Sequence, residues 1–388
     1  MRIVHLIMTG GYSEGWSYQD SVLVKEHARD NEVSVITTQY ERRKDTLVKV
    51  EDSFYVSPLG IRVYRLKHSW PVFPKKIRAI LRKYNGIYDL LVQIKPDIVF
   101  SHNLQYFGTN EIARYVKENP KTRLYVDNHA DFSNINKSWL SVNILHKFLW
   151  RHTARKLVPY TNMFWGVLPA RVDFLTNIYK TPTNKTAYLP LGMELDKAVC
   201  AEEKAKEGVI RKKFNIKKED FLIVTGGKID RFKTQTLMLM EAVLKLELDV
   251  KLIVYGSVYD DIKETFFSLV DDKKVFYAGW IDSDETYDYI ATADLVVYPG
   301  RHSVLWEQTV GQGRPMICKY WEGTTHIDIG GNVKFLYQDT IEEIYSVLYE
   351  VCTSEETYLE MLKAANRSER MKFSYCDIAK KSIELEGY

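Results

Sequence analysis

Two lysines, Lys228 and Lys233, flank a glycine turn in the second half of the chain. The turn, Gly227-Lys228-Ile229-Asp230-Arg231-Phe232-Lys233, follows an apolar run at Phe221–Thr225 and precedes a helical pattern at Leu237–Leu246. In open parallel sheets, ligands bind at the carboxyl ends of the strands, which is where this turn is expected. Ammonium groups there could neutralise a diphosphate, including the charge that develops on it as a sugar–phosphate bond breaks. A solvated basic turn is the alternative interpretation.

A second turn further along the chain offers another site for phosphate. The apolar run Leu295–Pro299 leads into Gly300-Arg301-His302-Ser303-Val304-Leu305, and a helix is expected to begin near Ser303–Leu305. The first amides of a helix are not used by its own hydrogen bonds, and with the helix dipole they attract anions. Glu307 lies about one turn inside this helix, where a carboxylate can accept both hydroxyls of a ribose. A helix that carries a surface glutamate is the alternative.

Two candidates lie in the first half of the chain. Gly10 and Gly11 follow the first apolar run directly, and glycine lets the backbone approach a ligand closely. They do not extend into the GxGxxG fingerprint, which argues against a nicotinamide enzyme, and a plain tight turn is the alternative. His129 follows another expected strand and lies between Asp127 and Asp131. Its alternative is a structural loop histidine, hydrogen-bonded to one of these carboxylates.

Parallel sheets must position these residues. Short, near-continuous apolar runs alternate with helical patterns, as in strands covered on both faces by helical crossovers. The first series of expected strands is Ile3–Met8, Val33–Thr37, Ile61–Arg65, Ile98–Ser101, Leu124–Asp127 and Met163–Val167. The second series is Phe221–Thr225, Leu252–Tyr255, Val275–Ala278, Leu295–Tyr298 and Met316–Lys319. Helical patterns include Lys75–Lys83, Leu140–Leu157 and a terminal segment at Tyr375–Leu385.

The length of 388 residues favours two domains, because single cores stop growing beyond roughly 250–300 residues. A charged stretch at Asp196–Lys218 separates the two strand series, and the junction is placed near Leu191–Val199. We therefore predict an N-terminal domain at residues 1–193, a C-terminal domain at 194–370 and a terminal helical segment at 371–388.

These segments together resemble the retaining GT-B glycosyltransferases of family 4, and the resemblance covers most of the chain. It implies an α/β fold of two facing Rossmann-like domains with parallel sheets and an inter-domain cleft. The turn at 227–233 is similar to the family's Gly-Arg-Leu-x-x-x-Lys turn, whose basic pair binds the donor diphosphate, with Lys228 in place of Arg. Arg301–Leu305 corresponds to the amides that hold the diphosphate, and Glu307 to the glutamate that binds the ribose.

The resemblance assigns further segments. His129 matches the acceptor-side histidine under the donor sugar, over which the Gly10–Gly11 loop also closes. Val275–Trp280 matches the strand whose exit contacts the base, which makes Trp280 a donor-binding residue. Tyr188–Glu194 is similar to the hinge. Lys372–Tyr375 is similar to the start of the C-terminal helix that crosses back to the first domain.

One departure from the family concerns the sugar. The family carries a Glu-x7-Glu pair, but Pro299 stands eight residues before Glu307, where the first glutamate is expected. Arg301-His302 replaces the Phe-Gly usual in that loop. The resemblance therefore implies that the diphosphate and ribose contacts are kept and that the sugar contacts are altered.

The implied activity is transfer of a sugar from a nucleotide-diphosphate sugar, with a UDP-sugar favoured, to a glycan or lipid-linked glycan with retention of configuration. His129, Lys228 and Lys233 are the implied catalytic residues, and neither cofactor nor metal is expected. The absent glutamate motivates an alternative, a non-catalytic GT-B subunit that binds glycan or a partner transferase. A nucleotide-sugar epimerase of the same architecture is a third hypothesis.

Composition narrows the partners and the location. A net charge of +3 gives no reason to expect nucleic acid. Four scattered cysteines fit a reducing compartment, the start does not read as a secretory signal, and no run approaches the roughly 20 apolar residues of a membrane span. We expect a cytoplasmic protein. The basic amphipathic segments 70–83 and 145–156 could rest on the inner membrane face, and ordinary surface helices are the alternative.

Overall fold

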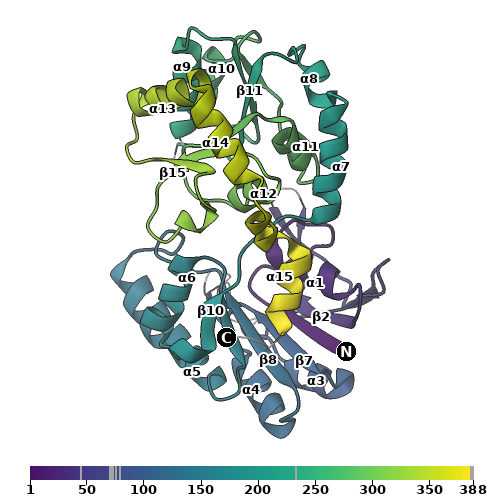
Figure 1. Cartoon of the computed structure of the whole chain (residues 1–388). Helices are drawn as coiled ribbons and strands as arrows, with labels where there is room; N and C mark the ends of the chain where they lie inside the picture. Colours follow the sequence, from purple (N-terminus) through teal and green to yellow (C-terminus); the bar gives the residue numbers. More distant parts are fainter. Residues whose placement is uncertain (44–45, 70–73, 75–76, 78–79, 232–233, 385–388) are drawn as a thin grey trace. The chain divides into compact units, whose positions relative to one another are not determined.

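The computed structural model describes residues 1–388 except 44–45, 70–73, 75–76, 78–79, 232–233 and 385–388. The chain forms two compact units (Figure 1). The first comprises Met1–Pro190 together with the residues from Ile378 onward, and the second comprises Leu191–Asp377. Residues at the second unit's two ends pair with each other, since the Met193 amide donates to the Phe373 carbonyl at 2.7 Å. This pairing explains why positions 193 and 370, the predicted boundaries, both fall inside the second unit.

The first unit is built on an eight-stranded sheet in the order β10-β9-β8-β7-β1-β2-β6-β5. Its pairs are parallel except β5 with β6, and a separate antiparallel hairpin joins β3 to β4. The strands are β1 Arg2–Ile7, β2 Glu32–Thr38, β3 Tyr40–Arg43, β4 Thr46–Lys49, β5 Phe54–Val56, β6 Arg62–Leu66, β7 Ile98–His102, β8 Arg123–Asn128, β9 Met163–Gly166 and β10 Thr186–Tyr188. The central strands β1, β7 and β8 are mostly apolar and almost wholly buried because helices cover both faces.

The helices of the first unit pack on this sheet and on one another. They are α1 Gln19–His27, α3 Ile87–Ile94, α4 Thr109–Glu118, a π-helix η1 Leu140–Trp150, α5 Arg151–Leu157, α6 Pro169–Phe174, a π-helical turn η2 Leu175–Tyr179 and a 3-10 turn η3 Thr183–Lys185. The last helix, α15 Tyr375–Ile383, returns to this unit at Ile378 and ends beside α1.

The second unit contains a six-stranded parallel sheet in the order β13-β12-β11-β14-β15-β16. Its strands are β11 Phe221–Gly226, β12 Val250–Tyr255, β13 Val275–Tyr277, β14 Leu295–Tyr298, β15 Met316–Lys319 and β16 Val333–Leu336. Its helical segments are α7 Leu195–Lys206, α8 Val209–Lys213, α9 Gln235–Lys245, α10 Lys263–Ser268, α11 Glu285–Thr292, α12 Leu305–Gly311, η4 Thr325–Ile327, α13 Ile341–Thr353, α14 Glu355–Ala365 and η5 Ser368–Phe373. Two apolar cores lie on opposite faces of this sheet, since alternate residues of β11 and β12 belong to different clusters.

Every strand expected in both series is present within about two residues of its predicted bounds. Edge strands β5, β10 and β16 were not predicted, because they are three or four residues long and only partly buried. The helix expected at 140–157 exists, but residues 140–150 are wound as a π-helix. Most of the helix expected at 75–83 lies outside the described residues. No helix among those described combines the length and apolar character needed to cross a membrane.

Candidate functional site

The strand order of the second unit reverses between β11 and β14. From β11 the chain adds β12 and β13 on one side, and β14, β15 and β16 on the other. Because β11 and β14 are paired and parallel, the loops that leave their carboxyl ends emerge side by side. Such a switch point is where open α/β sheets bind ligands. The loops in question are the two predicted phosphate turns.

The turn after β11 is held by close backbone packing. Gly227 has φ +119°, and its carbonyl lies against Gly256. A Cβ atom on Gly256 would stand 1.8 Å from the Gly227 oxygen, so no other residue fits there. The Gly256 amide also donates to the Gly279 carbonyl at 2.8 Å. The exits of β11, β12 and β13 are thereby tied together.

Lys228 extends from this turn into solvent. About half of its side chain is exposed, and its Nζ lies 3.4 Å from Asp230 Oδ2 and 4.4 Å from the centre of the Tyr259 ring. A hydrogen bond with the Tyr259 hydroxyl, and then one with Asp230, raises the pKa of Lys228. The ammonium group is therefore a permanent cation with an open side. Lys233, the second predicted cation, lies outside the described residues.

The turn after β14 presents backbone amides. Val304 is the N-cap of α12, and the first amides that donate within this turn are those of Trp306, to Ser303, and Gln308, to Val304. The preceding amides, from Ser303 to Leu305, are the ones that a helix start leaves for other acceptors. Arg301 is exposed at the mouth of the turn.

Glu307 is fully buried, so the interpretation as a surface glutamate is wrong. Its Oε1 accepts from His302 Nε2 and from His326 Nε2, each at 2.8 Å. Burial alone would raise the pKa of Glu307, but the charge and hydrogen bonds of the two histidines outweigh it and lower the pKa to about 2. The other oxygen, Oε2, is buried without a hydrogen-bond partner among the described residues. The site therefore keeps one unused acceptor on an ionised carboxylate.

His326 was not predicted from the sequence. It lies in the short 3-10 turn after β15, nineteen residues beyond Glu307, and no motif links the two positions. The ligand atoms of His302, Glu307 and His326 lie within 4.8 Å of one another, and two imidazoles with a carboxylate are also a donor set for a divalent metal. In the structure, two hydrogen bonds join the Nε2 atoms of these histidines to Glu307 Oε1.

Trp280 lies just after β13, on the loop tied to Gly256. It is 52% exposed, which is unusual for so large an apolar ring. Gly279, which precedes it, has φ +80° and no neighbouring atoms that a Cβ would meet. The indole is thus available for stacking on a flat ring.

In the Gly10–Gly11 loop of the first unit, packing requires glycine at one of the two positions. Gly11 has φ +85°, and a Cβ there would stand 2.1 Å from the Tyr40 carbonyl oxygen. The next amide, that of Tyr12, donates to Thr37 Oγ1. Gly10, in contrast, faces open space. Packing therefore explains why residue 11 is glycine. Gly10 is the residue of the pair whose surroundings leave room for a ligand.

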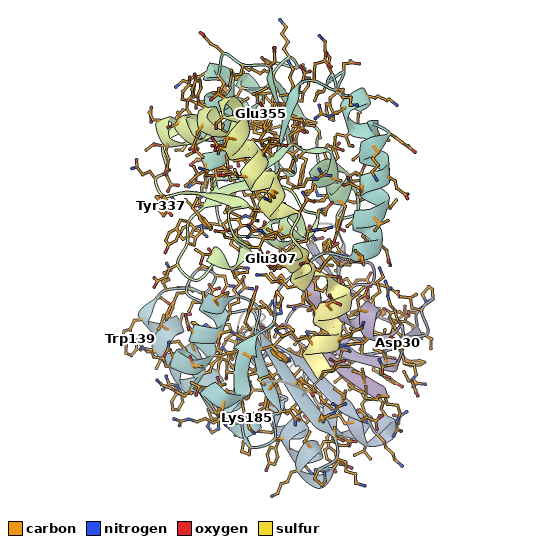
Figure 2. The ribbon with its side chains drawn as sticks, viewed as in Figure 1. Asp30, Trp139, Lys185, Glu307, Tyr337 and Glu355 are labelled. Atoms are coloured by element: carbon orange, nitrogen blue, oxygen red, sulfur yellow. The ribbon has the colours of Figure 1, made fainter. Side chains whose placement is uncertain are left out.

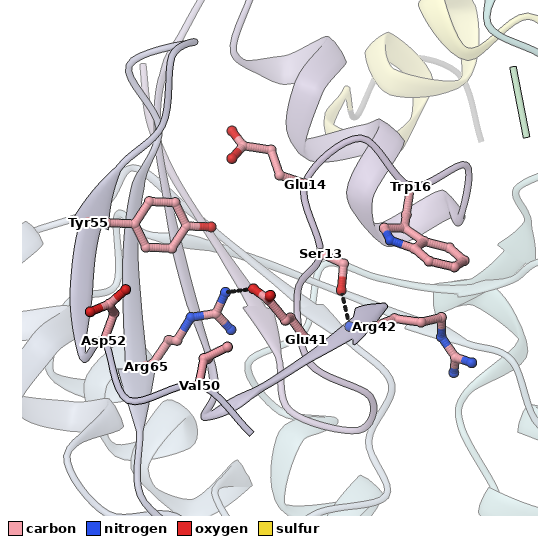
Figure 3. Close-up of a pocket in the computed structure, with 9 residues that line it drawn as sticks. All are labelled: Ser13, Glu14, Trp16, Glu41, Arg42, Val50, Asp52, Tyr55 and Arg65. Atoms are coloured by element: carbon pink, nitrogen blue, oxygen red, sulfur yellow. Dashed lines mark hydrogen bonds and ion pairs between the residues drawn. The ribbon is translucent and has the colours of Figure 1, made fainter. Parts of the chain in front are cut away.

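A cavity of about 320 Å³ follows this loop (Figure 3). Its lining residues are Ser13, Glu14, Trp16, Glu41, Arg42, Val50, Asp52, Tyr55 and Arg65. Arg65 is paired with Glu41 at 3.3 Å, and the carboxylates of Glu14 and Asp52 face the same space. Three carboxylates against two guanidinium groups do not suit an anionic diphosphate.

His129 lines a second cavity of the first unit, of about 390 Å³. This cavity lies at the unit's own switch point, since it is lined by Thr9 after β1 and Asn103 after β7, whose side chains are hydrogen-bonded, and His129 reaches it from the end of the next strand, β8. Other polar groups of the lining are Arg82, Gln105, Asn134, Asn136 and His146. The His129 ring is 30% exposed, and its Nε2 faces Asp127 Oδ1 at 3.4 Å. The contact with a neighbouring carboxylate, which the alternative interpretation as a structural loop histidine expects, is therefore present, beside a polar space large enough for a sugar.

The comparisons with known proteins come from structure. No protein-family model and no curated protein matches the chain. HepE from Anabaena, solved with UDP and glucose, is 12% identical over 98% of this chain and 97% of its own, with a TM-score of 0.63. A glycosyltransferase from Rickettsia africae is 13% identical over 99% and 97%, with a TM-score of 0.67. UDP-GlcNAc 2-epimerase from Neisseria meningitidis, bound to UDP-GlcNAc, is 13% identical over 98% of each chain, with a TM-score of 0.58.

The chain has a GT-B fold. This agrees with the fold class predicted from the sequence. Identities this low establish the fold alone, and transferases and an epimerase share it. The activity must be argued from the residues of the site.

Proposed function

We propose that the protein is a glycosyltransferase whose second unit binds a nucleotide-diphosphate sugar, with a UDP-sugar as the favoured donor. One observation carries the proposal: the Lys228 turn and the Ser303–Leu305 amides leave two paired strands at the point where the strand order reverses. A cation and a row of helix-start amides side by side suit a diphosphate.

The remaining donor contacts follow from this placement. Glu307 accepts a ribose hydroxyl through Oε2, and Trp280 stacks on the base. Lys233 supplies a second cation, and Arg301 and His302 stand where the sugar-contacting loop is expected. Stabilising the charge on the departing diphosphate is the main contribution of such a site to catalysis. We propose retention of configuration, with the diphosphate accepting the proton of the attacking hydroxyl, and no metal requirement.

The acceptor is assigned to the first unit, in the cavity lined by His129. Helix η1 borders this cavity, and large apolar side chains are exposed on it and at its N-cap: Trp139 at the N-cap, and Leu140, Ile144 and Phe148 in the helix. Trp139 projects at the edge of the unit in Figure 2. Lys147 and Arg151 lie on the same segment, so a lipid-linked glycan at an anionic membrane face is the proposed acceptor class. In the segment 70–83, Ile77 and Ile80 are among the described residues, and both apolar side chains are exposed.

The test compares Lys228→Ala with Lys218→Ala. Lys218 is an exposed lysine that precedes the amino end of β11, whereas Lys228 follows the carboxyl end of the same strand. UDP should raise the Tm of the wild type more than GDP or ADP, and UDP-glucose should be turned over with release of UDP. Lys228→Ala should weaken UDP binding about tenfold, in the range of a charge-assisted hydrogen bond, and Lys218→Ala should not. Absence of a Tm shift with all three nucleotides would overturn the proposal.

Two other functions are separated by the same assays. Pro299, in place of the family's first glutamate, favours a subunit that binds without turnover, and such a protein would bind UDP-glucose and leave it intact. The epimerase among the structural neighbours motivates the second. An epimerase would convert a UDP-sugar with no acceptor present, which product analysis by NMR detects.

A further inference from the structure

Three buried histidines of the first unit form a continuous hydrogen-bonded chain that ends on a carboxylate. His27 Nε2 lies 2.9 Å from the Ala379 carbonyl, and His27 Nδ1 lies 3.0 Å from His5 Nε2. His5 Nδ1 lies 2.9 Å from His102 Nε2, and His102 Nδ1 lies 2.6 Å from Asp127 Oδ2. The side chains of His27, His5, His102 and Asp127, which together we call the histidine relay, are each at most 3% exposed.

Different elements contribute each member of the histidine relay. His5 lies on β1, His102 ends β7, and Asp127 lies on β8, in strands that are paired in sequence across the sheet. His27 ends α1, and Ala379 lies on α15. The rings of His5 and His102 are stacked at 5.2 Å with an interplanar angle of 12°. Buried polar groups are hydrogen-bonded in native structures, so each of these ring nitrogens needs the partner that it contacts.

The groups at the two ends of the histidine relay determine which of the terminal ring nitrogens carry a hydrogen. A backbone carbonyl only accepts, so His27 Nε2 carries a hydrogen. Ser382 Oγ, 3.2 Å away, does not change this assignment, because its hydroxyl donates to the same Ala379 carbonyl at 2.8 Å. At the other end, the pKa of Asp127 is held far below its usual range by His102 and His129 against the effect of burial. Asp127 is therefore an acceptor, and His102 Nδ1 carries a hydrogen.

Each of the two contacts between rings needs one hydrogen as well. The three imidazoles together must therefore carry four ring hydrogens, whereas three neutral imidazoles carry three. One ring is an imidazolium. Burial, together with the charge of neighbouring histidines, lowers the pKa of His5 well below its usual range, and burial lowers that of His27 to about 4. These two rings are neutral, which leaves His102.

We propose that His102 is held as a buried imidazolium, donating to Asp127 and to His5, and that through Asp127 it positions the ring of His129. Asp127 Oδ1 accepts from the Asn103 amide at 2.9 Å and faces His129 Nε2. Because Asp127 only accepts, His129 Nε2 carries the hydrogen of this contact. On the proposed function, the ring held in this way contacts a sugar hydroxyl through Nδ1 in the cavity that His129 lines.

The protonation states are tested directly on the wild-type protein by NMR of ring nitrogens after ¹⁵N-histidine labelling. At pH 7, His102 should show two protonated ring nitrogens, and His5 and His27 should each show one, at Nε2. Cross-peaks through the ring–ring hydrogen bonds identify the three residues without substitution. A neutral His102 at this pH would overturn the proposal. This measurement does not depend on any enzymatic activity.

The positioning role is tested with two variants at one position. The amide of Asn at 102 lies near the Nδ1 position and can still donate to Asp127, whereas that of Gln lies near Nε2 and can donate only to His5. With UDP-glucose as the donor and glucose as the acceptor probe, the kcat of transfer should be about tenfold lower in His102→Gln than in His102→Asn, as expected for the loss of a charge-assisted hydrogen bond.

The two variants should bind UDP equally, because their substitution lies outside the second unit. Equal kcat values in two folded variants would overturn the positioning role. If the wild type itself did not turn over UDP-glucose, the proposed function would fail, and the NMR result would still decide the charge of His102. A variant that did not fold would be replaced by His5→Gln, which interrupts the histidine relay one ring further from Asp127.

Discussion

Each unit of the protein buries one carboxylate between two histidines, and the two centres are used differently. Asp127 in the first unit and Glu307 in the second are both completely buried, and both have a lowered pKa. Asp127 has contacts on both oxygens, from His102 on one and from Asn103 and His129 on the other. Glu307 accepts hydrogen bonds from both histidines on Oε1, and its Oε2 has no hydrogen-bond partner among the described residues. The first centre is a closed network, whereas the second retains an acceptor for a ligand.

The comparison predicts different costs of neutralising each carboxylate. Asp127→Asn leaves the His102 imidazolium buried without its counter-ion, so the free energy of unfolding should fall by about 3–5 kcal/mol. Glu307→Gln should cost less, about 1–3 kcal/mol, because the Gln oxygen can still accept the N–H of His326 that Glu307 Oε1 accepts. Urea denaturation of both variants measures the difference. A larger loss for Glu307→Gln would reverse the comparison.

Acid should weaken the first unit before the second. In the first unit, His5, His27 and His146 have lowered pKa values, about 4 for His27 and His146. In the second unit, His326 has a lowered pKa. Groups with a depressed pKa stabilise the fold above their unfolded value of about 6.5, and this contribution is lost as pH falls through the folded value. His27 alone accounts for on the order of 3 kcal/mol between pH 6.5 and 4.

Hydrogen exchange resolved by segment checks this prediction. Between pH 6.5 and 4.5, protection of β1 and β7 should fall more steeply than that of β11 and β14. Glu307 adds its own loss only at lower pH, because its pKa is about 2 in the fold and 4.5 without it, so its contribution is present above 4.5. Equal loss in both sheets over the upper range would contradict the assignment of neutral histidines to the first unit.

The unused oxygen of Glu307 predicts a smaller effect, on ligand binding. If Oε2 accepts a ribose hydroxyl, Glu307→Gln should weaken UDP binding about tenfold. The same substitution should weaken 2′-deoxy-UDP less, because one of the two ribose hydroxyls is absent from that ligand. Isothermal titration of two ligands against two proteins isolates the coupling between the hydroxyl and the carboxylate. Purely additive losses would place the ribose elsewhere.

Much of the scaffold could be predicted from sequence, because buried parallel strands are continuous apolar runs and the phosphate turns follow them directly. This pattern predicts the strand Phe221–Thr225 with Lys228 after it, and Leu295–Tyr298 with Glu307 after it, and the structure has both strands. His326 and the histidine relay were not predicted. Their partners are brought together by strand order, as His5 and His102 are, ninety-seven residues apart. No periodicity records such pairs. The π-helix at 140–150 was read as an ordinary helix, because its apolar spacing does not distinguish the two.

The carbonyls at the end of α15 have a consequence for how the protein is made. Besides Ala379, the carbonyl of Ser382 accepts from Trp165 Nε1, and that of Ile383 accepts from the Tyr125 hydroxyl. These donors lie in the interior of the first unit, on strands that a ribosome completes long before the C-terminus. Residues 1–190 alone lack the carbonyls that Tyr125 and His27 contact, so these hydrogen bonds, each worth about 0.5–1.5 kcal/mol, form only once α15 has been synthesised. The first unit is therefore complete only after the residues from Ile378 onward have been synthesised.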